Sequence, residues 1–142
     1  MTDEPPYLVR VGRIQEDAGK LLYYMLPEDG WVTRNFEYRK VGPVGEAVIT
    51  STFVDGAKVS IPVPRELTRV MTELRHAMAE FGKGAWLSTV MTVDHNGQMN
   101  CSYNYDEKPT WLAPVEDEAY ILDLEKYPRP AEAIPDWYPR PR

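Results

Sequence analysis

Histidine and cysteine are scarce in this chain, which limits the catalytic and metal sites that it could build. His76 lies in a predicted helix, His95 in a predicted turn, and the single cysteine, Cys101, in a predicted strand. A zinc site needs about four closely arranged ligands, and a nucleophilic cysteine needs a histidine or a helix N-terminus beside it. Glycine-rich phosphate loops and the motifs of serine hydrolases and metalloproteases are absent from the sequence. We therefore expect no catalytic residue, no metal and no cofactor.

Carboxylates are the more abundant reactive groups, and they gather in the last third of the sequence. From Asp94 to Asp136 there are ten acidic and three basic residues, a net charge of −7, whereas the whole chain carries −6. Such a field repels nucleic acid and anionic lipid, and it attracts basic partners and speeds their capture. Two clusters stand out, Asp106-Glu107 and Glu116-Asp117-Glu118. Glycosidases also use two carboxylates, but these must face each other across a cleft, which adjacency in sequence cannot show.

Aromatic residues concentrate in the same third of the chain. Tyrosine and tryptophan often anchor protein interfaces, although in a small domain most of them pack in the core. Tyr105, Trp111 and Tyr120 flank the acidic clusters and are therefore the candidate anchors. The predicted partner-binding residues are Tyr105, Asp106, Glu107, Trp111, Glu116, Asp117, Glu118 and Tyr120.

The elements that must position these residues follow from the spacing of apolar side chains. Steps of three and four residues predict helices over 7–25 and 64–81. Alternation and β-branched residues predict strands over 31–40, 46–54, 58–61, 85–93 and 98–105. Asp55-Gly56 and Asn96-Gly97 have the composition of tight hairpin turns, and 41–45 is expected to be a connector.

The acidic third contains a strand end, a loop over 107–114, a short helix over 116–127 and a proline-rich tail over 128–142. Acidic residues in the first turn of that helix suit its dipole. The tail is expected to be extended, as proline-rich segments are. Its apolar residues Ile134, Trp137 and Tyr138 are expected to anchor it on the body, whereas 1–6 is expected to be a loose N-terminus.

These elements predict one α+β domain over 1–142. The two hairpin turns imply an antiparallel sheet, and we expect about five strands flanked by helices, with the C-terminal tail packed on the body. A single cysteine excludes an internal disulfide and is compatible with the reducing cytosol. The N-terminus lacks the apolar region of a signal peptide, and no apolar run approaches roughly 18 residues. We expect a cytoplasmic protein.

A family resemblance is carried by residues 84–111, GAWLSTVMTVDHNGQMNCSYNYDEKPTW. This run resembles the YezG family of antitoxins, which are immunity proteins of bacterial polymorphic toxin systems. The resemblance lies in a strand led by Trp86, the turn Asn96-Gly97, the strand end over 103–106 and the Pro–Trp loop over 109–111. Asn104 departs from the pattern, because an aspartate is more usual there.

The closing stretch 120–137, YILDLEKYPRPAEAIPDW, also resembles the family's C-terminal pattern, and Leu26-Pro27-Glu28 fits it less specifically. The resemblance implies an α+β fold and inhibition of a cognate toxin by direct binding. The toxin would be a basic nuclease, an NAD-degrading enzyme or another cytotoxic enzyme.

The function that we expect is that of a non-enzymatic immunity protein with a toxin domain as its partner, and with neither nucleic acid nor membrane as a partner. A small enzyme acting on a cationic or sugar substrate is an alternative, and it would need a cleft with convergent carboxylates or a tyrosine–histidine pair with shifted pKa values. A ligand-binding module is a second alternative, and it would need a deep apolar pocket.

Overall fold

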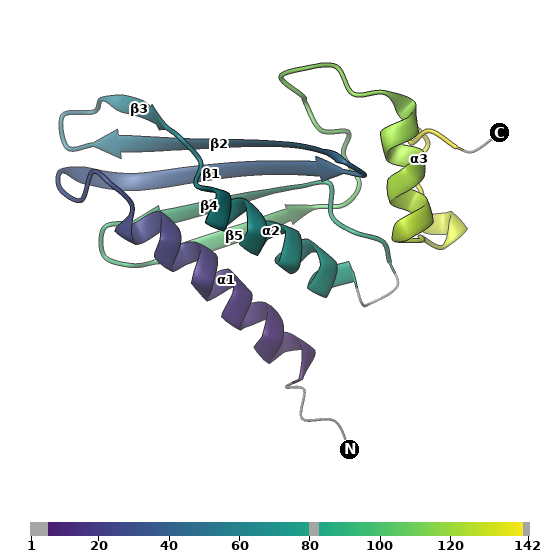
Figure 1. Ribbon diagram of the computed structural model, residues 1–142, viewed down its shortest axis with the longest axis horizontal. Coiled ribbons are helices and arrows are strands. Elements are labelled where there is room, and N and C mark those ends of the chain that lie inside the picture. The colour runs from purple at the N-terminus through teal and green to yellow at the C-terminus, as the bar shows by residue number, and fades with distance from the viewer. Residues whose placement is uncertain (1–5, 80–82, 141–142) are drawn as a thin grey trace.

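The computed structural model describes residues 6–79 and 83–140. Within them, an antiparallel sheet has the strand order β3-β2-β1-β4-β5. Helices α1 (Tyr7–Tyr24) and α2 (Arg65–Met78) lie over one face of this sheet, and α3 (Asp117–Lys126) stands at the end where β1 and β2 join (Figure 1). The predicted α+β fold with a five-stranded antiparallel sheet is confirmed. None of the described helices combines the length and the apolar character needed to cross a membrane.

The strands follow the predicted pattern closely. Their bounds are β1 Trp31–Val41, β2 Val44–Phe53, β3 Lys58–Ile61, β4 Ser88–Asp94 and β5 Met99–Asn104. The turns predicted at Asp55-Gly56 and Asn96-Gly97 are confirmed, and both glycines adopt the positive φ that such turns require. The predicted connector over 41–45 is instead a third tight turn, because Val41 pairs directly with Val44 and only Gly42 and Pro43 lie between them.

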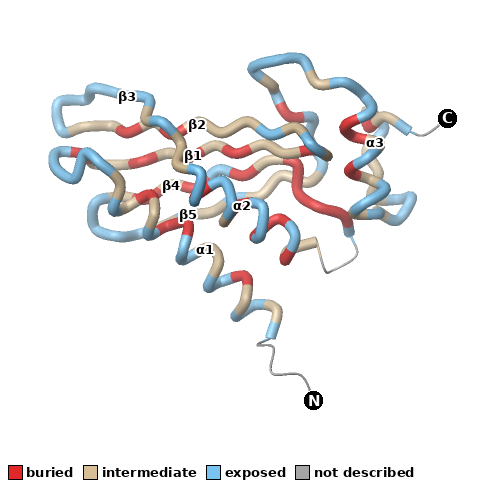
Figure 2. The backbone as a smooth tube through the Cα atoms, in the orientation of Figure 1, coloured by how far each residue is buried: buried red, intermediate tan, exposed pale blue. Residues whose placement is uncertain are grey.

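The main core lies between the sheet and the two helices that cover it. Phe36 on β1 pairs with Ile49 on β2 and with Met91 on β4, so these three buried side chains form a row across the sheet. The apolar stripes of the helices cover this row with Leu22, Leu67, Met71 and Leu74. Within the sheet, the buried residues lie on the three central strands β1, β2 and β4, and further buried residues lie along α1 and α2 (Figure 2).

A second, smaller core fixes α3 and the tail at the end of the sheet. Its buried members are Val41, Leu87, Ala119, Tyr120 and Tyr138. A Cβ atom added to Gly42 would lie 2.6 Å from the backbone oxygen of Ala119, and Gly42 also has φ +53°. The helix therefore approaches the β1–β2 turn as closely as only glycine allows.

The C-terminal tail packs on the body, as predicted. The Tyr138 hydroxyl donates to the Tyr120 carbonyl at 3.0 Å, and the Trp137 indole N–H donates to the Asp106 carbonyl at 2.7 Å. The prediction that the tail is extended was wrong in one part, because Ala131–Ala133 form a short 3-10 helix. The Ala133 N–H donates to the Pro130 carbonyl at 2.8 Å there.

Candidate functional site

The predicted binding residues lie on the loop over 105–116 and on the first turns of α3. The loop leaves β5, arches away from the sheet and returns at the start of α3 (Figure 1). Asn104 fixes its beginning: its side-chain oxygen accepts the N–H groups of Asp106 at 3.2 Å and Glu107 at 2.8 Å, and its amide nitrogen donates to the Glu107 carbonyl at 2.8 Å. The start of the loop is thus ordered by a side chain of the sheet.

Glu46 on β2 fixes the middle of the same loop. Its two carboxylate oxygens accept the N–H groups of Leu112 at 2.8 Å and Ala113 at 2.9 Å, and Arg39 lies 3.3 Å from one of them. Partial burial raises the pKa of Glu46, but the two backbone donors and Arg39 together outweigh that effect, so its pKa lies below the ordinary value. Glu46 is therefore a clamp for the loop, a role that sequence reasoning did not assign to it.

The five predicted carboxylates all reach solvent, and we call them the acidic surface: Asp106, Glu107, Glu116, Asp117 and Glu118. The side chain of Asp106 is 80% exposed and lies 4.0 Å from Arg129, which makes at most a weak ion pair. Within the described part of the chain, none of the other four carboxylates forms an ion pair. Glu116 makes no side-chain cap bond to α3, so its carboxylate also stays available.

The predicted aromatic anchors divide into two kinds. Tyr120 is only 2% exposed and its hydroxyl accepts the Trp111 indole N–H at 2.8 Å, so it supports the surface and cannot reach a partner. The Tyr120 ring is enclosed by Trp137 and Tyr138, so the prediction that it contacts a partner directly does not fit its position. Trp111 and Tyr105 are half-buried, and each keeps one part in the core and another at the surface.

Burial also governs the acidity of these phenols. Desolvation raises the pKa of Tyr120, although the bond from Trp111 opposes the rise, and it raises the pKa of Tyr138 to about 12. Both phenols thus stay protonated at neutral pH and act as hydrogen-bonding groups of the small core.

Sequence reasoning missed three buried ions, Arg34, Arg75 and Asp123. Asp123, which belongs to the acidic third, is 3% exposed and binds Arg75 through two bonds of 2.7 and 2.8 Å. Its spacing from Ala119 and Tyr120 on α3 puts it on the buried face of that helix, which is the signal that could have found it. Arg34 lies two residues before Phe36 on β1 and therefore points to the same, buried face of the sheet. Its guanidinium donates to two carbonyls at the end of α1.

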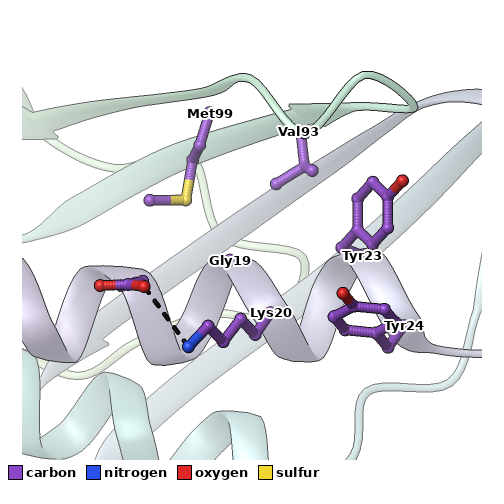
Figure 3. A pocket seen from close by; sticks show the side chains of 8 residues that line it. Gly19, Lys20, Tyr23, Tyr24, Val93 and Met99 are labelled. Atoms are coloured by element: carbon purple, nitrogen blue, oxygen red, sulfur yellow. Dashed lines mark ion pairs between the residues drawn. The ribbon is translucent and has the colours of Figure 1, made fainter.

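A cleft at the opposite end of the sheet was not predicted from the sequence. It encloses about 400 Å³ between α1 and the β4–β5 hairpin, where Met99 and Val93 face Gly19 and Tyr23 (Figure 3). Lys20 and Glu16 on its rim pair with each other at 3.3 Å. Tyr23 is fixed by a bond from its hydroxyl to the His95 carbonyl at 3.0 Å. The cleft offers apolar contact area and no convergent acid–base groups.

Cys101 and His76, which could in principle serve catalysis or metal binding, lie in surroundings that do not activate the thiol or assemble a metal site. Desolvation raises the pKa of the Cys101 thiol, so this cysteine is not activated as a thiolate. His76 lies on the surface with its Nδ1 atom 3.0 Å from the Tyr127 hydroxyl. Over residues 6–79 and 83–140, no group of three or more histidine, cysteine, aspartate or glutamate side chains is arranged to hold a metal ion.

Comparison with known proteins gives one family. Residues 7–121 match the family model described as "Immunity protein YezG-like". This match covers most of the chain and all the predicted binding residues, whereas the second half of α3 and the tail lie beyond it. The chain has no match among curated proteins.

Proposed function

Because the chain belongs to the YezG-like immunity protein family, we propose that it neutralises a cognate bacterial toxin by direct binding and has no catalytic activity of its own. The family supports a toxin protein as the partner in general. Our proposal is more specific: the partner is a toxin domain of a polymorphic toxin system, the encounter takes place in the cytoplasm, and neither nucleic acid nor membrane takes part.

The acidic surface is the part of the molecule that we propose for toxin binding. The observation that carries this proposal is that five exposed carboxylates project from backbone that Asn104, Glu46 and the small core hold in place. A fixed array of like charges attracts a basic surface, sets the encounter rate and discriminates against acidic partners. The partner that fits is a basic cytotoxic enzyme, such as a nuclease, whose cleft the array would cover.

Aromatic contacts would then hold the complex together. Trp111 and Tyr105 have partly accessible rings beside the carboxylates, and such rings contribute much of the binding energy in protein interfaces. Tyr120 contributes indirectly, because its hydroxyl fixes the orientation of the Trp111 ring.

Charge reversal tests this proposal. We expect that Asp106→Lys with Glu107→Lys, and separately Glu116→Lys with Asp117→Lys and Glu118→Lys, will reduce protection of cells that express the toxin encoded beside this chain's gene. With purified proteins, the association rate constant should fall at least tenfold at low salt, and the loss should shrink as salt is added.

The matched control is Glu28→Lys with Asp29→Lys, which reverses two exposed carboxylates at the opposite end of the sheet. It should protect as well as the wild type. Full protection by both acidic-surface variants would overturn the proposed surface. An inactive wild type would overturn the immunity role itself.

A further inference from the structure

A cationic pocket lies where β1, α2 and α3 meet. It encloses about 380 Å³, and its charged lining residues are Lys40 from β1, Arg75 from α2, and Asp123 and Lys126 from α3. Three cations and one carboxylate therefore surround this space in a chain whose net charge is −6. The local charge is opposite in sign to that of the acidic surface, so this pocket suits a different kind of ligand.

The single carboxylate of the pocket is already fully engaged. Asp123 accepts two bonds from Arg75, at 2.7 and 2.8 Å, and a third from the backbone N–H of Gly42 at 2.9 Å. Its negative charge neutralises the guanidinium of Arg75, and the ammonium groups of Lys40 and Lys126 have no counter-charge from it. Among the residues that the structure describes, neither Lys40 nor Lys126 has a carboxylate within ion-pair distance. The pocket thus holds about two uncompensated positive charges.

The pKa of Lys40 reflects the unfavourable surroundings of its charge. Its burial lowers the pKa of the ammonium group, the nearby charges of Arg75 and Lys126 lower it further, and Asp123 only partly opposes them. A half-buried cation beside two other cations gains from any anion that enters the pocket.

The rest of the pocket lining is mostly apolar. Pro43, Leu122 and the Tyr127 ring contribute to it, together with Gly42 and Thr72. The Tyr127 ring centre lies 5.5 Å from the guanidinium carbon of Arg75 and 5.4 Å from the ammonium nitrogen of Lys126. The volume exceeds what a single small anion fills, so the apolar walls have room for an organic group attached to it.

We propose that this pocket binds a phosphate-type oxyanion, free or as a monoester, between the ammonium groups of Lys40 and Lys126. The Arg75–Asp123 pair forms the rigid floor, and the Tyr127 ring forms one wall. A doubly charged oxyanion matches the two lysines that lack partners. The negative net charge of the chain does not prevent this binding, since charges more than about 8 Å away are largely screened at physiological salt. The proposal is independent of toxin binding.

An NMR titration of the full chain tests it. Inorganic phosphate and phenyl phosphate are the two probes, and sodium chloride at equal ionic strength is the reference. We expect saturable shifts of the signals of Lys40, Gly42 and Lys126 with either probe. Tighter binding of phenyl phosphate would identify a monoester as the ligand, and equal binding would identify free phosphate. At ten times the Kd, the melting temperature should rise by roughly 4 °C over the chloride reference.

Lysine-to-glutamine variants complete the experiment. Lys40→Gln and Lys126→Gln should each weaken binding about tenfold, while Lys20→Gln on the exposed side of α1 should bind as the wild type does. Melting temperatures in chloride check that each variant is folded. Shifts that rise linearly without saturating, or an affinity unchanged in the Lys40/Lys126 double variant, would overturn the proposal.

Discussion

Asn104 shows how one amide group can order an acidic loop. Its oxygen accepts two backbone N–H groups, and its nitrogen donates to the Glu107 carbonyl and, at 3.0 Å, to the Ser88 hydroxyl oxygen. An ionised aspartate could accept the same bonds but could not donate the other two. In this chain, the amide of position 104 therefore serves the loop backbone in a way that a carboxylate could not.

Asn104→Asp should consequently destabilise the chain even though the two side chains have the same shape. We expect the free energy of unfolding in urea to fall by about 1–2 kcal/mol, because two acceptors lose their donor. Hydrogen exchange should become faster at the amides of Asp106 and Glu107. Asn100→Asp, at an exposed position on the same strand, is the control and should change neither quantity. Equal behaviour of the two variants would contradict the role given to Asn104.

The loop over 105–116 depends on the second strand as much as on its own sequence. Glu46 holds it through two backbone bonds, and the pKa of Glu46 lies below its ordinary value for that reason. A carboxylate whose pKa is lowered by folding stabilises the native state at a pH above its unfolded pKa. That contribution disappears as the pH falls through the folded pKa.

Glu46→Gln should therefore remove a pH-dependent part of the stability. We expect the variant to be less stable than the wild type at neutral pH, and the difference to shrink steadily as the pH falls below the ordinary glutamate pKa. Urea unfolding midpoints measured between about pH 3 and 7 check this expectation. Glu73→Gln, on the exposed side of α2, is the reference substitution. A difference that stays constant over this pH range would refute the clamp.

Local patterns were sufficient to predict most elements of this fold. Alternation and β-branched residues located the five strands, and the two Xaa-Gly dipeptides located their turns, because these signals depend on neighbouring residues alone. The β1–β2 turn was missed because Val41-Gly42-Pro43-Val44 lacks the usual hairpin dipeptide. The sequence also predicted that the five carboxylates are exposed, but it could not show that Tyr120 is enclosed, since Trp137 and Tyr138 come from the distant tail.

The protein has two hydrophobic cores, and the buried ion pair between Arg75 and Asp123 connects the helices that flank them. Arg75 belongs to α2 beside the main core, whereas Asp123 belongs to α3 beside the small core. The guanidinium also donates to the Trp86 carbonyl at 2.7 Å, which links both helices to the segment before β4. This pairing joins residues 48 positions apart. No local pattern predicts such a partner, so counting charges along the sequence could not show that Asp123 is neutralised inside the protein.

Asp123→Asn should be strongly destabilising, because it leaves the buried guanidinium of Arg75 without a counter-charge. We expect a loss of about 3–5 kcal/mol in the free energy of unfolding. Arg75→Met combined with Asp123→Leu should lose less than Asp123→Asn alone, since it leaves no unpaired charge. Asp106→Asn, which removes an exposed carboxylate 4.0 Å from Arg129, should change stability by less than about 1 kcal/mol. Similar losses for Asp106→Asn and Asp123→Asn would contradict the distinction between the two carboxylates.

The close approach of Gly42 to Ala119 has an evolutionary consequence. Because the backbone of the turn and the backbone of α3 meet there, the seat of the helix does not depend on the side chains that face outward. Glu116, Glu118 and Leu122 can therefore be exchanged without displacing the helix, while Gly42 and Asp123 cannot. Such a division would let the outer face of α3, where we propose contacts with the toxin, change its sequence while the close backbone approach beneath it keeps the helix in place.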